Sequence, residues 1–153
     1  AQYFFKDMEG RAHLQQARLF LETSMVQYAV ENASNAQIAK MAVTVEECDA
    51  SLTDITKFRG ADVKFHRALA EVPGNPIFVA LHEAFVDRLM RNAPIKANSK
   101  EHNTASNEGH KKIISAILAR DTDAAVKSLT AHLVRNYEVF LPGSISRGKE
   151  ESS

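Results

Sequence analysis

The distribution of proline restricts this chain more than any other feature of its sequence. The four prolines, at positions 73, 76, 94 and 142, all lie after residue 72. The preceding segment therefore lacks the residue that most strongly breaks a helix, so long helices are allowed there. No segment shows a convincing alternation of apolar and polar residues between hairpin turns. These features predict a chain built from helices rather than strands.

Apolar residues recur at intervals of three and four, as on one face of a helix. The stripe of the first predicted helix consists of Leu14, Ala17, Leu21, Met25 and Tyr28. That of the fourth consists of Ile77, Leu81, Phe85 and Leu89. Residues suited to cap helix N-termini are Ser34 or Asn35, Ser106 and Asp121. These signals predict six helices, at about residues 8–32, 35–52, 54–72, 77–91, 106–120 and 121–141.

The length of 153 residues suits a single hydrophobic core. We expect an all-α antiparallel bundle of six or seven helices. Residues 1–141 would form this domain. Residues 142–153 are rich in Ser, Gly, Lys and Glu and have nothing to bury, so they are predicted to form a flexible tail.

Charge, apolar content and cysteine usage restrict the class of protein. Nineteen basic and nineteen acidic residues give zero net charge, which disfavours direct binding of nucleic acid by this segment. No apolar run is long enough to span a membrane. Cys48 is the single cysteine, so no internal disulfide can form. We expect a soluble cytoplasmic domain, and because the chain opens on Ala1 rather than Met, a further segment upstream.

Four polar residues on apolar helix faces are predicted to converge. Asp62 and His66 are four residues apart, so they project from one face of the third helix. His110 lies on the apolar stripe of the fifth helix and His132 on that of the sixth. Each lies roughly 15 Å from the turn between these helices at a rise of 1.5 Å per residue. Two antiparallel helices would therefore hold both imidazoles at one height.

Three imidazoles and a carboxylate in a bundle core have the composition of a metal site for zinc, nickel or another divalent ion. The alternative is that the histidines are hydrogen-bonded core residues that bind nothing. The other histidines, His13, His82 and His102, are expected at the surface, at the rim or in a loop. Cys48 is interpreted as an inert buried thiol.

The sequence resembles the effector-binding (FCD) domain of GntR-type transcription regulators of the FadR subclass, over roughly residues 8–140. The motifs that carry the resemblance are Asp62-Val63-Lys64-Phe65-His66, Gly74-Asn75-Pro76, His110 with Ile113, Asp121, Ala125, and His132-Leu133. Within the family, the match is closest to the repressors of bacterial sialic acid catabolism that respond to sialic acid. The segments specific to that match include Arg18-Leu19-Phe20, Phe65-His66-Arg67, Pro73 to Phe78, and Glu101-His102-Asn103.

The resemblance implies that Asp62, His66, His110 and His132 are metal ligands. Zinc is the expected ion, with nickel or manganese as alternatives. It further implies that a carboxylate-bearing effector completes the coordination, and that a winged helix-turn-helix domain precedes this one in a homodimeric repressor. DNA would be bound by that absent domain and not by the present segment.

Two further residues are predicted to contact the effector. The guanidinium of Arg18 could pair with a carboxylate, although an ion pair with Glu22 on the same helix is the alternative. Asn103 could hydrogen-bond a sugar hydroxyl, or it could serve only as a loop or capping residue.

The leading hypothesis is therefore a sensor without catalytic activity that binds an acidic sugar, N-acetylneuraminate, at a metal ion and thereby controls DNA binding. One alternative keeps the sensor but changes the effector to a hexuronate, an aldonate or another small carboxylate. The other is a metal-dependent hydrolase or isomerase. The enzyme is disfavoured because no general base lies one turn from a ligand, and Glu108 should point away from the site.

Overall fold

The computed structural model describes residues 8–92 and 99–137 as six α-helices, with no strand among these residues. The helices are α1 (Met8–Asn32), α2 (Asn35–Asp49), α3 (Ile55–Ala70), α4 (Pro76–Asn92), α5 (Lys100–Leu118) and α6 (Thr122–Tyr137). The predicted all-α bundle is confirmed, and its helix number is six. The proposed tail, residues 142–153, lies outside the described residues.

Five helices, α2 to α6, begin at a residue whose side chain accepts a hydrogen bond from the backbone of the first turn. Asn75 does so for α4 and the predicted cap Asp121 for α6. Ser34 caps α2 in a reciprocal capping box with Gln37, and Asp54 caps α3. The cap of α5 is Ser99, whose side chain accepts from the backbone N–H of His102. The prediction that Ser106 caps this helix is wrong, because Ser106 is buried within α5. The first turns of α5 are polar and the apolar stripe begins later, so hydrophobic periodicity predicts a loop where the helix begins.

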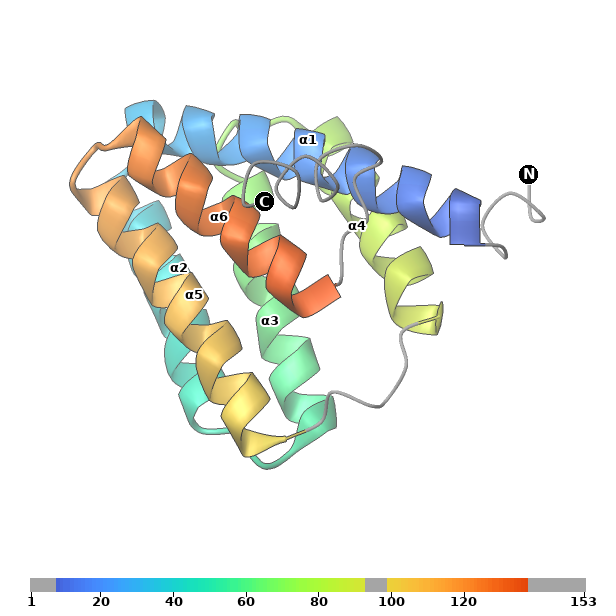
Figure 1. Ribbon diagram of the computed structural model, residues 1–153. Helices are drawn as coiled ribbons and strands as arrows, with labels where there is room; N and C mark the ends of the chain where they lie inside the picture. The colour runs from blue at the N-terminus through green and yellow to red at the C-terminus, as the bar shows by residue number, and fades with distance from the viewer. Residues whose placement is uncertain (1–7, 93–98, 138–153) are drawn as a thin grey trace, which may run out of the picture.

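The helices pack around a core formed by one face of most of them. α5 and α6 form an antiparallel hairpin, α2 packs against both α3 and α5, and α1 lies across α6 and α4 (Figure 1). The largest fully buried apolar side chains are Phe65, Met41, Leu69, Ile113, Ile117, Leu129 and Leu133. None of the described helices is both long enough and apolar enough to cross a membrane. The bundle therefore places the middle of α3, α5 and α6 at its centre.

Two predicted apolar stripes are only partly correct, although Leu14 and Met25 on α1 are buried as expected. On α1, Ala17 and Tyr28 are exposed, whereas Arg18 and Glu22 are buried. On α4, Ile77 and Leu81 are 63% and 42% exposed, and the buried positions are His82 and Val86. Hydrophobic periodicity assigns polar residues to the outside, so it fails where a helix turns polar side chains into the core.

The turn between α5 and α6 is fastened to the end of α1. Arg120 adopts a left-handed backbone conformation with φ of 54°. The backbone N–H groups of Arg120 and Asp121 donate to the carbonyls of Ile117 and Ala116, the pattern that ends a helix in a Schellman motif. The Arg120 guanidinium donates to the carbonyls of residues 29, 30 and 33 at 3.4, 3.0 and 2.9 Å. It thus satisfies carbonyls that helix geometry leaves unpaired at the end of α1.

Candidate metal centre

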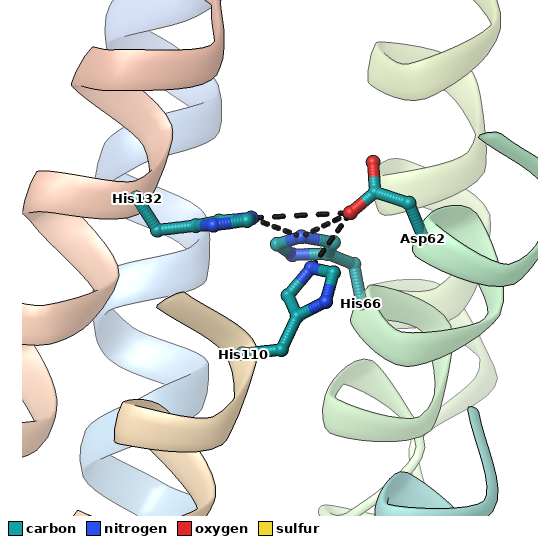
Figure 2. A group of neighbouring side chains, drawn as sticks. All are labelled: Asp62, His66, His110 and His132. Carbon is teal, nitrogen blue, oxygen red and sulfur yellow. Dashed lines mark hydrogen bonds and ion pairs between the residues drawn. The ribbon is translucent and has the colours of Figure 1, made fainter. Parts of the chain in front are cut away.

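Asp62, His66, His110 and His132 meet in the middle of the bundle (Figure 2). Asp62 and His66 come from α3, His110 from α5 and His132 from α6. Each offers one ligand atom, and these atoms all lie within 4.8 Å of one another. All four side chains are buried, with exposures between 0% and 5%. The structure therefore brings together the four residues that helix spacing had placed at one level.

A glycine allows α6 to approach α5 closely at this level. A Cβ atom at Gly109 would lie 2.7 Å from Nδ1 of His132, which is closer than real Cβ atoms pack. The rings of His110 and His132 lie 4.4 Å apart between centroids. The absence of a side chain at Gly109 thus lets the two imidazoles share one site.

The spacing of the ligand atoms suits one small ion. The Oδ1 atom of Asp62 lies 2.7 Å from Nε2 of His110, 3.4 Å from Nε2 of His66 and 3.9 Å from Nε2 of His132. The Nε2 atoms of His66 and His132 are 3.1 Å apart. Ligands about 2.0–2.1 Å from a tetrahedral zinc ion are separated by about 3.3 Å. The observed separations scatter around this value, so the four residues fit a divalent metal.

Burial controls the charge of the cluster. Burial lowers the pKa of His110 and that of His132 below the ordinary value, which leaves these imidazoles neutral, as a metal requires. Burial also opposes ionisation of Asp62, but hydrogen bonds from His110 and His66 outweigh it and hold the Asp62 pKa well below its usual range. The cluster thus presents a carboxylate and the neutral imidazoles of His110 and His132 to the same point.

His110 is oriented by an asparagine that is itself fixed. The Asn107 amide nitrogen donates to the carbonyl of Val45 at 3.1 Å and to the carboxylate of Asp49 at 2.8 Å. Its oxygen is therefore left to accept from Nδ1–H of His110, at 2.9 Å. With the proton on Nδ1, the lone pair of Nε2 would be available to an ion that Asp62 also binds, in place of the 2.7 Å contact between Nε2 and Oδ1 of Asp62. Such outer hydrogen bonds set the tautomer of a ligating histidine.

His66 is oriented by a buried carboxylate that the sequence analysis did not connect with it. Nδ1–H of His66 donates to Oε1 of Glu22, which directs Nε2 toward the cluster. Burial opposes protonation of His66, but Glu22 and Asp62 outweigh it and raise the His66 pKa to about 9. The other Glu22 oxygen accepts from Nε of Arg18 at 2.6 Å. Despite burial, Arg18 and His66 keep the Glu22 pKa well below its usual range.

The third imidazole also has an amide beside Nδ1. The side-chain amide group of Asn136 lies 3.3 Å from Nδ1 of His132 and 2.6 Å from Oγ of Ser106. Two imidazoles of the cluster therefore donate from Nδ1 to a side-chain acceptor, His66 to Glu22 and His110 to Asn107, whereas the Asn136 amide nitrogen lies almost equally near Nε2 of His132, at 3.4 Å. Outer acceptors of this kind are typical of histidines that bind metals.

The predicted effector residues lie in different surroundings. Arg18 is 3% exposed and forms the ion pair with Glu22 that was its alternative interpretation. Asn103 is also buried, on the first turns of α5, and its amide donates to the carbonyl of Leu52 at 2.9 Å. Arg18 is thus linked to His66 of the cluster through Glu22, which contacts both residues. Asn103 instead joins α5 to the connection between α2 and α3.

Two expectations about other histidines are wrong. His82 is fully buried instead of lying at the surface, and burial lowers its pKa to about 4. Val79 and Val86, three and four residues away on α4, are the apolar neighbours that could have indicated this burial. His102 lies on α5 rather than in a loop. His13 is exposed, as expected.

Cys48 lies closer to the cluster than its sequence neighbours suggest. It is fully buried, with Sγ 4.0 Å from Nδ1 of His110. Burial, followed by the charge of Asp62, raises the Cys48 pKa to about 12, so the thiol stays protonated. This agrees with the interpretation of Cys48 as an inert thiol.

The fold and the cluster define a class of protein: an all-α domain with a buried cluster between three of its helices that could hold one ion. The FCD domain family model matches residues 13–135, and the chain belongs to this family. The HTH-type transcriptional repressors NanR of Citrobacter rodentium and Salmonella newport are 46% and 44% identical to it over 135 residues. In both cases the match covers 87% of this chain and 52% of the relative. The chain thus spans about half the length of these relatives.

Solved structures share the fold at low sequence identity. The chain matches E. coli McbR/YncC with a TM-score of 0.78 and 18% identity, over 87% of this chain and 68% of that one. It matches the metal-free FCD domain of the transcriptional regulator TM0439 with a TM-score of 0.62 and 19% identity, over 90% and 92%. The names of the NanR relatives and of TM0439 describe transcriptional regulators.

Proposed function

We propose that this domain is the sensor of a transcriptional repressor and binds an acidic sugar, N-acetylneuraminate, at a divalent metal ion. Asp62, His66, His110 and His132 would hold the ion. The observation that carries the proposal is the convergence of these four buried side chains, with an outer hydrogen-bond acceptor at Nδ1 of His66 and of His110. The similarity to the NanR repressors supports the regulatory role.

The donor set favours zinc. Imidazole and carboxylate ligands suit zinc, and the separations of the ligand atoms match its short bonds. Nickel and manganese are the alternatives, since both also accept nitrogen and oxygen ligands. When bound, the ion would supply open coordination positions for a carboxylate and a neighbouring hydroxyl of the effector.

Arg18 is placed to report on the effector carboxylate. Its guanidinium is buried and shares Glu22 with His66, so a second carboxylate near it would compete for its donors. A shift of Arg18 toward the effector would alter the hydrogen bond that orients His66. Asn103 is the other proposed effector contact, through a sugar hydroxyl. A ligand can shift the domain between two states only by such differential contacts.

The decisive experiment is a calorimetric titration of the domain with N-acetylneuraminate, a hexuronate and an aldonate, with and without a chelator. We expect saturable binding of N-acetylneuraminate that disappears after metal removal and returns with zinc. Tighter binding of another acid would keep the sensor and change its effector. Unchanged sugar affinity in metal-stripped protein would rule out the metal-dependent mechanism.

A metal-dependent hydrolase or isomerase remains the competing function, and two carboxylates bear on it. Glu108 is exposed and pairs with Lys111 at 3.2 Å, so it does not face the cluster. Glu22 does lie beside the cluster, but its oxygens are engaged by Arg18 and His66, which leaves it a poor general base. Recovery of N-acetylneuraminate unchanged after prolonged incubation is the result expected of a sensor.

The match covers only 52% of the length of the NanR relatives, so the rest of the regulator is a matter of proposal. We propose that a winged helix-turn-helix domain upstream binds DNA in the cytoplasm, and that the regulator is a homodimer, as two-fold symmetric operators require. Phe20 on α1 and Ile77 on α4 are 66% and 63% exposed, and these two helices pack against each other. This apolar surface is suited to a second copy of the chain. Light scattering of the wild type and of Phe20→Ser would test it, with a monomer expected for the variant.

A further inference from the structure

A second group of side chains with metal-ligand chemistry lies on the opposite side of His66. Glu22 on α1, His66 on α3 and His82 on α4 each offer one ligand atom, and these atoms lie within 4.8 Å of one another. All three side chains are fully buried. The two groups share His66 alone, which has one ring nitrogen toward each.

His82 is the residue that points to a ligand not yet accounted for. Among the described residues, neither of its ring nitrogens has a hydrogen-bond partner, although its exposed fraction is 0%. Buried polar groups in native proteins are almost always paired, because an unmade hydrogen bond lowers stability. The rings of His82 and His66 are nearly parallel, 6.2 Å apart between centroids. A buried imidazole whose ring nitrogens have no hydrogen-bond partner among the described residues thus lies beside the Glu22 carboxylate.

We propose that Glu22, His66 and His82 form a second divalent metal site that shares His66 with the first. In this site, Nδ1 of His66 changes from a hydrogen-bond donor into a ligand, and its proton is released to solvent. Glu22, no longer the acceptor of that hydrogen bond, contributes a carboxylate oxygen, and His82 contributes a ring nitrogen. When both sites are filled, His66 is an imidazolate that bridges the two ions.

The charges predict that the second site binds more weakly than the first. Glu22 shares its negative charge with Arg18, whose Nε lies 2.6 Å from the other carboxylate oxygen. The second site also has two imidazoles, whereas the first has three. Binding there additionally requires loss of the His66 proton. We expect the second site to bind the ion about 10-fold or more weakly than the first. This difference is of the size seen when outer hydrogen-bond partners of metal ligands are removed.

Zinc titration of the metal-free domain, with elemental analysis of the bound ion, tests the proposal. The wild type should bind two equivalents, the second more weakly. His82→Phe should lose the weaker equivalent and keep the tighter one, and His132→Ala should lose the tighter one. His13→Phe, at an exposed position of α1, is the matched control and should keep both. A single equivalent in the wild type and in His82→Phe alike would overturn the second site.

A copper measurement on the wild-type domain tests the second metal site even if His82→Phe does not fold. Two Cu²⁺ ions bridged by an imidazolate couple magnetically, so the electron paramagnetic resonance intensity should fall when the second equivalent is added. An intensity that doubles would contradict the bridge. If the domain with both ions bound does not bind N-acetylneuraminate, the result would contradict the sensor function but not the second metal site.

Discussion

The two nitrogens of His66 face surroundings of opposite character. Toward Nε2 lie Asp62 and two imidazoles, and each of those imidazoles has its own side-chain partner at Nδ1. Toward Nδ1 lie the Glu22–Arg18 ion pair and His82, whose ring nitrogens have no partner among the described residues. The first side gathers four possible metal ligands, whereas the second combines an ion pair with an imidazole that has no hydrogen-bond partner among the described residues.

This difference separates the part of the buried cluster that serves the tighter metal site from the part that also stabilises the fold. On the Nε2 side, the hydrogen bond to Asn107 holds His110 in a tautomer that a metal can use. On the Nδ1 side, opposite charges neutralise each other in the core, where removing one of them leaves the other uncompensated. Substitutions on the first side should therefore change the affinity of the tighter metal site, and those on the second should change stability and the binding of the weaker ion.

Replacement of a ligand on the Nε2 side should have the largest effect. His132→Ala removes one of four donors, so zinc affinity should fall by more than about 100-fold, beyond the range seen for outer partners. Isothermal titration calorimetry measures this loss, and circular dichroism checks that the helices remain. His13→Ala, at an exposed position, should bind as the wild type does. A variant without His132 that kept full affinity would remove it from the site.

Removal of the carboxylate on the Nδ1 side should mainly affect folding. Glu22→Ala removes the carboxylate that pairs with Nε of the buried Arg18, so the metal-free domain should lose about 3–5 kcal/mol of unfolding free energy. Urea denaturation measures the change. Glu31→Ala, at an exposed position of the same helix, should alter the free energy by less than about 0.5 kcal/mol. Equal effects of the two substitutions would contradict the proposed role of the buried pair.

An outer partner on the Nε2 side should have an intermediate effect on binding. Asn107→Ala removes the acceptor that keeps the proton on Nδ1 of His110, so zinc affinity should fall by about 10–100-fold. Competition with a coloured chelator measures it. Asn35→Ala, at an exposed position of α2, is the control. An unchanged affinity in Asn107→Ala would show that the His110 tautomer is set by something else.

The pH dependence of the metal-free domain should separate His66 from its neighbours. Burial lowers the pKa values of His82, His110 and His132, so the unfolded chain binds protons that the folded chain does not, and stability should fall from pH 7 to pH 5. The His66 pKa is raised to about 9, so its contribution is complete below the unfolded value of 6.5 and is lost as pH rises through 9. Urea denaturation at pH 5, 7 and 9 should give a maximum near pH 7. A steady rise to pH 9 would contradict this assignment.

The bundle and the convergence of its central residues were predictable because both follow from regular geometry. A rise of 1.5 Å per residue and a single turn at residues 120–121 fix the relative heights of His110 and His132. The four-residue spacing of Asp62 and His66 fixes their common face. No knowledge of side-chain packing was needed for either inference.

The Nδ1 side of His66 could not be predicted, because it violates the pattern from which a core is recognised. Glu22 and His82 are polar residues on inward faces, and Arg18 is turned inward with them. Periodicity treats such residues as surface, and only the neighbours on other helices show that they satisfy or need one another. For the same reason, periodicity does not predict that the apolar residues Phe20, Ile77 and Leu81 are exposed.

The clamp formed by Arg120 has a consequence for the order in which the molecule is built. Its guanidinium closes the end of α1 from a position 87 to 91 residues later in the chain. During synthesis the N-terminal helix emerges first, yet its last carbonyls acquire these donors only after the turn between α5 and α6 has left the ribosome. Nascent chains that end before residue 120 therefore lack the donors for the last carbonyls of α1, and translation of the turn between α5 and α6 supplies them.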